Sequence, residues 1–512
     1  MLAKQMIRFA AAIQCIPPNR VVPGLAEHHH VIMQELADAA INLVNTNDAL
    51  LGTLEGLENI IFEALYHIDG GNIRRSWITM RRAVMAGQLL GLHRSHHHRF
   101  KVISETNDLE PGAMWACIVT MERVLSLLLG LPTSTGYPSF EALQTSRTRV
   151  EMLNLPTLLS SVTAKILERN QINVSQQALD MTQEIDRELI KMTEKLPSEF
   201  WQPLALSSLG NDSMDAAREI RLAWDQMWYY TLVNQLHLPY MMAPNHASQM
   251  VYSRIACVNA SREVLSRQIT VRTLNQNTAC SRMGDFLALI AGMTLMLAHA
   301  VSHCQKPEKP ADNPLTHQRL SDRATVERAL DCMNSMSGLH EDVLAVKCAG
   351  LLKDLLAIEA AAAEGKRQGT SGGGEGKHTT LVITVPYIGA LSIGRDGVKS
   401  LVPSEAEQGH GQGEGVTIGG IGCMYLNGPM LPGHSTSDVR SDAGVAVEAT
   451  TMVGQTASVA PIHSGGLQTQ QDQMFPDAAA PLGDWIFQGF DTAFFDVLMR
   501  EQLDDSAERW NF

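Results

Sequence analysis

The chain has 512 residues, of which 45% are hydrophobic and 18% are charged, and its formal net charge is −14. Such a length is enough for one large hydrophobic core with appendages or for several average domains. Because an acidic body repels the phosphates of a duplex, this charge argues against a large nucleic-acid-binding surface on the polypeptide.

Eight cysteines are spread along the chain, and no two of them stand at C-x-x-C spacing. This pattern fits reduced thiols packed in an intracellular protein, and it favours neither a disulfide framework nor a zinc site. The N-terminal stretch 1–15 shows no clear secretory cleavage pattern and is interpreted as the first helix. The longest apolar run, residues 286–298, is too short to cross a bilayer, so we expect a buried helix there and no membrane contact.

Residues 1–363 contain few runs of β-branched side chains and carry helix breakers at fairly regular intervals. No repeat of fixed period is visible, so a tandem-repeat solenoid is not expected. The apolar spacing predicts an all-α fold, a multi-helix bundle or array of about a dozen helices. These helices are expected roughly at 3–14, 28–45, 48–68, 71–90, 111–129, 157–168, 174–194, 213–236, 247–271, 281–303, 318–337 and 341–363.

The helix expected over 71–90 shows the pattern in detail. Asn72 follows a turn signal and is expected to accept amide hydrogen bonds from the first turn of this helix. Off the apolar stripe, four arginines (Arg74, Arg75, Arg81 and Arg82) favour a solvated face over a partner-binding surface. The stripe itself recurs at alternating spacings of four and three and comprises Ile73, Trp77, Met80, Val84, Gly87 and Gly91, the last of which can end the helix in the left-handed conformation.

The composition changes at residue 364. Residues 364–377 have the composition of a flexible linker, and the Gly- and Ser-rich character continues to about 480. Within this region, residues 380–394 are β-branched and apolar and predict a short hairpin folded back onto the helical body, with Pro386 at an edge or a bulge. The rest of the region is expected to be a disordered arm, because it has too few apolar side chains to offset its ordering entropy.

The final segment, 481–512, is acidic and rich in aromatic residues. Apolar side chains recur there at i+4 spacing, so a helix would gather them on one face. Such a helix is expected either to bind in a groove of a partner protein or to dock on the helical body as a latch. The residues singled out for these two roles are Trp485, Phe490, Asp491, Phe494 and Phe495.

Motifs that carry catalysis or bind a cofactor are not found in the sequence. Histidines 28–30 and 96–98 are dense, but adjacent helical residues point in different directions, and no H-E-x-x-H or paired-cysteine motif completes a metal site. The glycines of residues 372–377 lack the strand and the hydroxyl residue of a phosphate-binding loop. No G-x-S-x-G nucleophile motif occurs. We therefore expect no catalytic residues, no resident cofactor and no metal site.

Residues 47–138 carry a series of motifs on two expected helices. One helix has an arginine–tryptophan start and ends in GLHR, and a later helix has a tryptophan, an acidic–arginine pair and a final LG-x-P. The residues of these motifs are Arg75, Trp77, Gly91, Leu92, His93, Arg94, Trp115, Glu122, Arg123, Gly130 and Pro132. This series resembles the middle homology region of fungal zinc-cluster transcription factors, and the general resemblance extends over residues 1–360.

The resemblance implies structural roles for these residues. Trp77 is expected to anchor the core, His93 and Arg94 to form a capping or interhelical pair, and Glu122 and Arg123 to join a buried charge network. The family's DNA-binding cluster needs six closely spaced cysteines, and none precedes the first helix. Zinc is therefore expected only if such a cluster exists upstream of this sequence.

The same resemblance implies a nuclear regulator of RNA polymerase II transcription, in which residues 1–363 form the regulatory domain. A role in carbon or secondary metabolism is expected, with coactivators or a DNA-binding partner, a second copy of the chain and a small-molecule inducer as partners. The alternative is a small-molecule-binding or coregulator protein without direct DNA binding. Its pocket would lie between helices, and the methionines of 241–242 and 293–296 either line it or simply fill the core.

Overall fold

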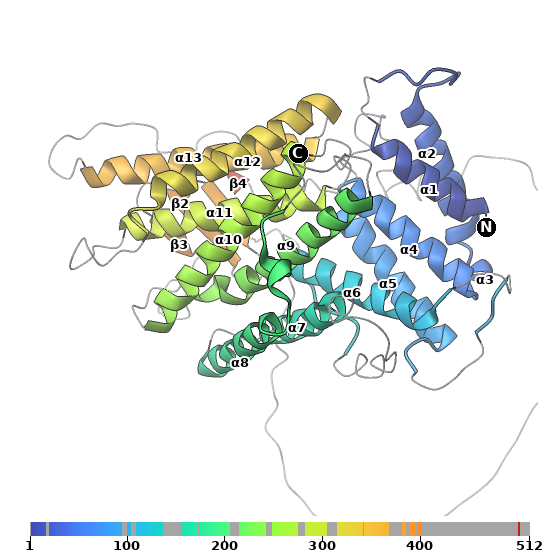
Figure 1. Ribbon diagram of the computed structural model, residues 1–512, viewed down its shortest axis with the longest axis horizontal. Coiled ribbons are helices and arrows are strands. Elements are labelled where there is room, and N and C mark those ends of the chain that lie inside the picture. Colours follow the sequence, from blue (N-terminus) through green and yellow to red (C-terminus); the bar gives the residue numbers. More distant parts are fainter. Residues whose placement is uncertain are drawn as a thin grey trace, which may run out of the picture. The chain divides into compact units, whose positions relative to one another are not determined.

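The fold was determined from a computed structural model of the chain (Figure 1). It divides into two units, Met1–Val402 with Ala480–Phe512, and Pro403–Ala479, and the described residues all belong to the first unit. Up to residue 367 these residues form an all-α body. The described residues are 2–16, 20–94, 100–103, 109–136, 155–172, 175–204, 214–241, 248–274, 282–304, 315–340, 343–367, 381–385, 389–394, 397–400 and 500–501.

The first part of the body is built on the packing of α4 against α5 and of α5 against α6, with α1 covering α2 and α4. Thr53 begins α4, because its hydroxyl accepts the amide hydrogen of Gly56, and Pro111 at the first helical position begins α6. The elements are α1 (Leu2–Gln14), α2 (His29–Ala40), a π-helical turn (Ile41–Asn45), α3 (Asp48–Leu51), α4 (Leu54–Asp69), α5 (Ile73–Leu90) and α6 (Pro111–Leu129).

The second part contains the longest helices, and α9 and α10 form its most extensive helix pair. Ser175 caps α8 by accepting the amide hydrogen of Ala178. The elements are α7 (Leu155–Arg169), α8 (Gln176–Thr193), a 3-10 turn (Ser198–Trp201), α9 (Met214–Met241), α10 (Ser248–Leu274), α11 (Met283–Cys304), α12 (Arg319–His340) and α13 (Val343–Arg367).

Helix α9 continues five residues beyond the end expected at 236 and passes through Pro239. Proline has no amide hydrogen, so the carbonyl four residues earlier, that of Gln235, loses its helical donor. The buried Arg169 of α7 takes over this role, because its guanidinium donates to the carbonyls of Gln235 at 3.3 Å and Leu236 at 2.9 Å. The side chains of the last helical residues, including Tyr240, are buried, so tertiary packing keeps this turn helical.

The prediction that the side chain of Asn72 caps α5 is wrong. The connection between α4 and α5 has only three residues and holds Asn72 at φ −86° and ψ 63°, outside the extended conformation of ordinary capping residues. Its side chain makes no capping hydrogen bond to α5; instead its backbone amide donates to the carbonyl of His67 at 2.7 Å and so closes the end of α4. A second difference is that α13 reaches Arg367, four residues past the expected boundary at 363.

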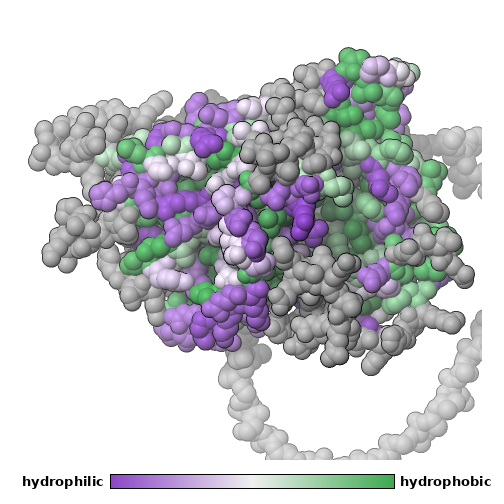
Figure 2. Space-filling view, viewed as in Figure 1, coloured by the Kyte–Doolittle hydropathy of each residue, from purple (hydrophilic) through white to green (hydrophobic). Residues whose placement is uncertain are grey.

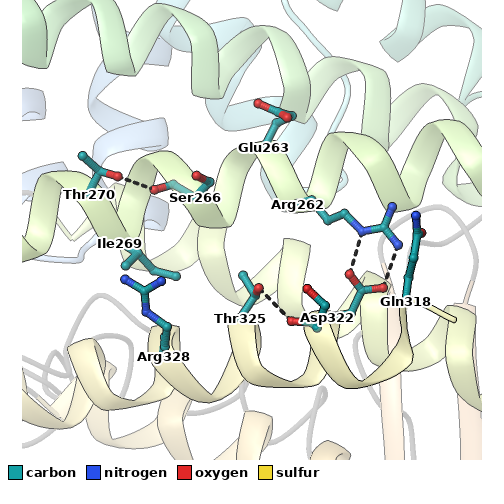
Figure 3. A pocket seen from close by; sticks show the side chains of 10 residues that line it. Arg262, Glu263, Ser266, Ile269, Thr270, Gln318, Asp322, Thr325 and Arg328 are labelled. Carbon is teal, nitrogen blue, oxygen red and sulfur yellow. Dashed lines mark hydrogen bonds and ion pairs between the residues drawn. The ribbon is translucent and has the colours of Figure 1, made fainter. Parts of the chain in front are cut away.

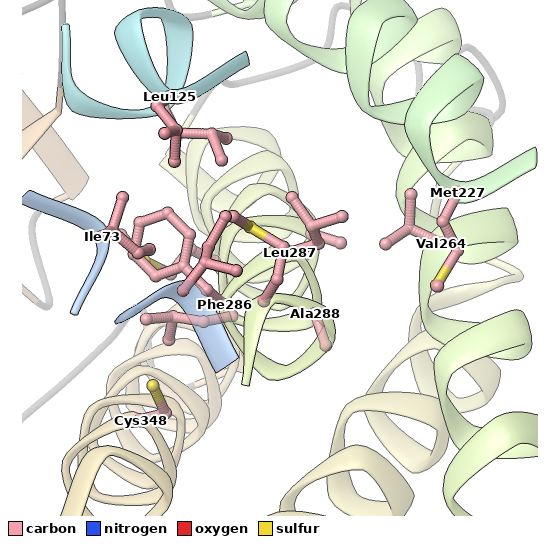
Figure 4. Close-up of a cluster of buried hydrophobic side chains, with 14 of the residues drawn as sticks. Ile73, Leu125, Met227, Val264, Phe286, Leu287, Ala288 and Cys348 are labelled. Atoms are coloured by element: carbon pink, nitrogen blue, oxygen red, sulfur yellow. The ribbon is translucent and has the colours of Figure 1, made fainter. Parts of the chain in front are cut away.

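The main hydrophobic core draws side chains from nine of the described helices, α3 to α6 and α9 to α13, and part of it is drawn in Figure 4. Phe286 and Leu287 of α11 lie at its centre, close to Ile73 of α5, Leu125 of α6 and Cys348 of α13, as Figure 4 shows. Smaller clusters lie between α7, α8 and α9 and between α1 and α2. The core is therefore shared between the first and second parts of the body, so a displacement of α11 would affect both.

Short strands follow the helical body. The strand β1 (Leu381–Val385) pairs antiparallel with β2 (Gly389–Gly394), with Leu381 opposite Ile393. Further strands, β3 (Gly397–Ser400) and the two-residue β4 (Arg500–Glu501), extend the sheet in the order β3-β2-β1-β4. Strands β1 and β2 lie within the predicted β segment 380–394, but β3 lies beyond it and β4 lies in the segment 481–512, where a helix was expected, so the strands form a four-stranded sheet rather than an isolated hairpin. Pro386 and most of 401–512 lie outside the described residues.

Within the part of the chain that the structure describes, two helices, α6 and α11, are long and apolar enough to cross a membrane by length and composition alone. Within α11, however, 89% of the apolar window is buried inside the fold, which is typical of a core helix. In Figure 2 the visible surface of α8 is hydrophilic, whereas hydrophobic side chains gather over α1 and α2. Two large apolar side chains of α1, Leu2 and Phe9, are 76% and 61% exposed.

Candidate functional site

Gly87, from the apolar stripe of α5, meets the motif residue Trp115 where α5 crosses α6. A Cβ atom at Gly87 would lie 3.0 Å from Cζ3 of Trp115, so only glycine allows the indole of Trp115 to lie this close to α5. Trp115 is 1% exposed and belongs to the main core. The close approach fixes the crossing of the two helices that carry most of the family-like motifs.

Glu122 is fully buried on α6 and accepts hydrogen bonds from several donors. Arg81 of α5 donates to its Oε1 at 3.1 Å, and the hydroxyl of Thr133 donates to its Oε2 at 2.7 Å. The backbone amide and the hydroxyl of Ser134 donate at 2.8 and 3.1 Å. A buried carboxylate is stable only with such partners. Glu122 therefore joins α5, α6 and the segment that follows α6.

Trp77 belongs to the same network. Its indole nitrogen donates to the hydroxyl of Ser126 at 2.9 Å, and Ser126 in turn donates to Glu122 at 3.4 Å. The guanidinium of Arg81 lies over the Trp77 ring at 4.9 Å, a cation–π contact. Trp77 is only partly buried and packs against the edge of the main core, so its role is polar as well as apolar.

Arg123, the residue after Glu122, is 1% exposed and points to different neighbours. Its Nε donates to the hydroxyl of Thr135 at 3.2 Å, and its guanidinium also donates to the carbonyls of Gly136 and of Ser160 on α7. Together, Glu122 and Arg123 hold the segment 131–136 on both sides. We refer to Arg81, Glu122, Arg123 and their partners as the α6 network.

The motif residues at the helix ends shape this region. Gly91 and Gly130 end α5 and α6 with φ angles of 84° and 69°, which glycine adopts without strain. Leu92 is buried, and the ring of His93 lies 6.3 Å from that of Trp115, so His93 faces α6. The side chain of Arg94 is exposed. Pro132 contributes its carbonyl, which accepts a hydrogen bond from Arg81 at 3.3 Å.

The arginines of α5 divide into two kinds. Arg74 and Arg75 are exposed, as a solvated face predicts. Arg81 and Arg82 are partly buried instead: Arg81 joins Glu122, and Arg82 donates to the carbonyl of Asn45 at 2.5 Å. The spacing that placed all four off the apolar stripe could not show that two of them meet distant acceptors.

A second buried charge cluster, which the sequence did not reveal, centres on Asp322 of α12 (Figure 3). Arg262 of α10 forms two hydrogen bonds to its carboxylate, at 2.6 and 2.8 Å, and His299 of α11 lies 2.8 Å from it. Burial acts to raise the pKa of Asp322, but the hydrogen bonds from Arg262 and His299, with their charges, outweigh it and hold this pKa below its ordinary value. Asp322 thus ties α10, α11 and α12 together.

Among the described residues, the methionines and histidines that were singled out do not form a site of the kinds considered; histidines 96–98 and Met242 lie outside these residues. Met241, Met293 and Met296 belong to the main core, so they fill it. His29 and His30 pack ring against ring at 4.7 Å, and burial, together with the charge of His29, lowers the pKa of His30 to about 4. Among the described residues, no three or more His, Cys, Asp and Glu side chains lie where they could hold a metal ion.

The α6 network is the candidate functional site that the family-like motifs define. Glu122 and Arg123 are both buried, so neither charge is open to a substrate, and the arrangement stabilises helix packing. Sequence reasoning missed Arg81, Ser134 and Ser160, which carry no local signal. The tail residues expected to contact coactivators or the body (Trp485, Phe490, Asp491, Phe494 and Phe495) lie outside the described residues.

Comparisons with known proteins identify the family. The chain is 54% identical over 527 residues to the probable transcription factor gsfR1 of Penicillium aethiopicum, an alignment that covers 100% of this chain and 76% of that protein. It is also 34% identical to the dehydrocurvularin biosynthesis regulators of Alternaria cinerariae and Aspergillus terreus, over 98% of this chain and 72% of each of them. No family model and no solved structure matches it.

These relatives are named as transcription factors or regulators, not as enzymes. Their similarity spans the whole helical body, including the α6 network, and it agrees with the resemblance carried by residues 47–138. The chain is a transcription regulator, and it belongs to a family of fungal transcription factors that includes regulators of biosynthetic pathways.

Proposed function

We propose that this chain is a pathway-specific regulator that acts in the nucleus and controls RNA polymerase II transcription of the genes of one secondary-metabolite pathway. One observation carries the proposal: two relatives that are 34% identical over 98% of the chain are named as regulators of the biosynthesis of a single compound. Carbon catabolism, the other expectation from the sequence, has no comparable support.

Within this proposal the helical body, residues 1–363, is the regulatory domain. Its buried ion pairs support such a role, because a charge removed from water must keep its partners, and this requirement limits the helices to a few well-defined arrangements. A signal that changes one pairing would therefore shift whole helices rather than single side chains. The body either holds the activity in check or responds to a metabolite.

The experiment that tests the pathway assignment is deletion of the gene in its source fungus, followed by transcript sequencing. We expect transcripts of one set of biosynthetic genes to fall and overexpression of the chain to raise the same set. A deletion strain in which no biosynthetic gene set changes under conditions where the chain is expressed would contradict the assignment. Re-introduction of the intact gene is the control.

The segment 481–512 is proposed to contact coactivators through its apolar face, with its acidic residues keeping it soluble. A latch on the body is the competing role, and the pairing of β4 (Arg500–Glu501) with β1 at Leu381 and Val382 supports it. The two roles predict different results when residues 481–512 are deleted. Loss of reporter activation with unchanged body stability supports the coactivator role; reduced melting temperature with unchanged activation supports the latch.

The similarity to transcription factors also supports proposals about the partners of this chain. The chain is inferred to reach its promoters with a DNA-binding partner or as a homodimer, and an inducer is inferred to act on the helical body. Co-purification of the tagged chain from nuclear extract, with and without nuclease, tests the first of these. Partners retained after nuclease treatment support a protein contact, whereas complete loss of every partner contradicts it.

A further inference from the structure

A groove of about 370 Å³ lies between α10 and α12. This volume falls within the range of small-molecule sites. The groove is lined mostly by polar side chains, and Figure 3 shows Arg262 at one end, over Asp322, and Arg328 at the other end, below Ile269. The residues that line it are Arg262, Glu263, Ser266, Ile269, Thr270, Gln318, Ser321, Asp322, Thr325 and Arg328.

The charges of the groove are not balanced along its length. Arg262 and Asp322 satisfy each other through two hydrogen bonds, and Glu263 pairs with Arg267 of the same helix. Arg328 is exposed and forms no ion pair or hydrogen bond with another described residue. Among the described residues that line the groove, Arg328 is therefore the cation without a partner, and it would interact favourably with an anion at the Ile269 end.

The walls beside Arg328 suit a small molecule with both apolar and polar atoms. Ile269 offers a buried apolar surface at this end. The hydroxyls of Thr270 and Thr325 each donate to a carbonyl of their own helix, at 2.8 and 2.9 Å, which leaves their oxygen lone pairs facing outward as acceptors. A ligand hydroxyl can donate to these acceptors while a carboxylate meets the guanidinium of Arg328.

We propose that the groove between α10 and α12 binds a small hydroxylated carboxylic acid, with its carboxylate on Arg328 and its carbon skeleton against Ile269. The proposal that the groove binds such an acid does not depend on what the chain does. The further statement that this acid is the inducer of the regulator rests on the proposed function above. A phosphate monoester carries more negative charge than Arg328 alone can balance, so a carboxylate is the better match.

The position of the groove explains how ligand binding would change the packing of helices beyond α10 and α12. Asp322 connects α10, α11 and α12, and α12 is tied to α13 because Arg319 and Arg323 both pair with the buried Glu359. A ligand that bridges α10 and α12 at Arg328 would favour the arrangement in which these four helices are locked together. Such a coupling requires only that the ligand bind this arrangement more tightly than another.

The test measures binding to the full purified chain with named probes: 4-hydroxybenzoate, 4-hydroxyphenylacetate and 3-hydroxyoctanoate at millimolar concentration, each compared with its carboxamide. We expect at least one carboxylate to raise the melting temperature and its carboxamide not to. Isothermal titration should then show about a tenfold weaker affinity for Arg328→Gln, and no change for the control Arg187→Gln on the exposed face of α8. Arg328 is exposed, so this variant is expected to fold.

Two outcomes would overturn the proposal: no stabilisation by any of the three carboxylates, or equal stabilisation of the wild-type chain and Arg328→Gln. Inorganic phosphate serves as a further probe, and binding of phosphate with the same dependence on Arg328 would show a general anion site instead. If the purified chain binds the carboxylate but deletion of its gene changes no biosynthetic transcripts, the proposed binding site stands and the proposed function is contradicted. If the transcripts change but no carboxylate binds, the proposed function stands and the binding site is contradicted.

Discussion

The buried carboxylate of Glu122 on α6 pairs with Arg81 on α5 at 3.1 Å, and the same arginine lies over the ring of Trp77. This relationship joins two of the family-like motifs in space, although Arg81 and Glu122 are 41 residues apart in the sequence. It also orders the segment after α6, because Thr133 and Ser134 donate to the same carboxylate.

Replacing Glu122 by alanine should lower the free energy of unfolding by about 2–4 kcal/mol, because the buried hydroxyl of Ser126 and the partly buried donors of Thr133 and Ser134 lose their acceptor. Urea unfolding followed by circular dichroism measures this difference. The matched control is Glu184→Ala on the exposed face of α8, which should change stability by less than about 0.5 kcal/mol. Equal stability of the two variants would show that the α6 network contributes nothing to folding.

Replacing Gly87 by valine should also destabilise the body, by about 1–3 kcal/mol, because any side chain there meets the buried Trp115. Tryptophan fluorescence should shift as the indole of Trp115 moves. Gly52→Ala is the control, since a Cβ atom at Gly52 has no heavy atom within 4 Å. If Gly87→Val unfolds at the same temperature as the wild-type chain, α5 and α6 do not cross as described.

Asp322→Asn removes the charge that Arg262 and His299 share, and it should cost about 2–3 kcal/mol of stability. The control on the same helix is Asp331→Asn, because Asp331 is exposed. Hydrogen exchange measured by mass spectrometry should show faster exchange in α10, α11 and α12 for the Asp322 variant alone. Exchange that increases only within α12 would contradict the connection of three helices through Asp322.

Stability should fall as the pH drops below 6.5, in part because of His67. Burial, with a smaller effect of the charge on Arg75, lowers the pKa of His67 to about 3, so between pH 6.5 and this value the unfolded chain binds a proton that the folded chain does not. The contribution of His67 to folding is therefore complete above pH 6.5 and declines by about 1.4 kcal/mol for each pH unit below it.

The measurement compares the wild-type chain with His67→Gln, whose side chain does not titrate, in urea titrations at several pH values between 4 and 7. The difference between the two slopes isolates His67 from Glu63, whose pKa burial raises and whose effect on the pH dependence has the opposite sign. Parallel stability curves for the two chains would mean that His67 is not buried in the neutral form.

Much of the helical body could be predicted from the sequence, and the rest depends on distant contacts. Apolar spacing and glycine stops located α5 and α6 to within two residues, because these signals are local. The helix expected to end at 236 continues through Pro239 to Met241, because Arg169 of another helix donates to the carbonyl of Gln235 that the proline leaves without its helical donor. Asn72 was expected to cap α5, but in the three-residue connection its side chain makes no capping hydrogen bond and its backbone amide donates to the end of α4.

The residues of the α6 network and of the Asp322 cluster likewise divide into those that the sequence indicates and those that only the structure shows. Trp77 and Glu122 could be singled out because they lie in recognisable motifs, but their partners Ser126 and Ser134 could not, since a serine near a helix end has no distinctive pattern. Arg262, His299 and Asp322 carry no motif at all. Their cluster exists because three helices far apart in the sequence pack together, so only the structure reveals it.

The central claim, that this chain directly regulates the genes of a biosynthetic pathway, is tested most directly by chromatin immunoprecipitation of the tagged full chain in its source fungus. The account predicts enrichment at the promoters of the same genes whose transcripts fall in the deletion strain, whether the chain contacts DNA itself or through a partner. Absence of the chain from those promoters while their transcripts respond to its deletion would contradict the claim.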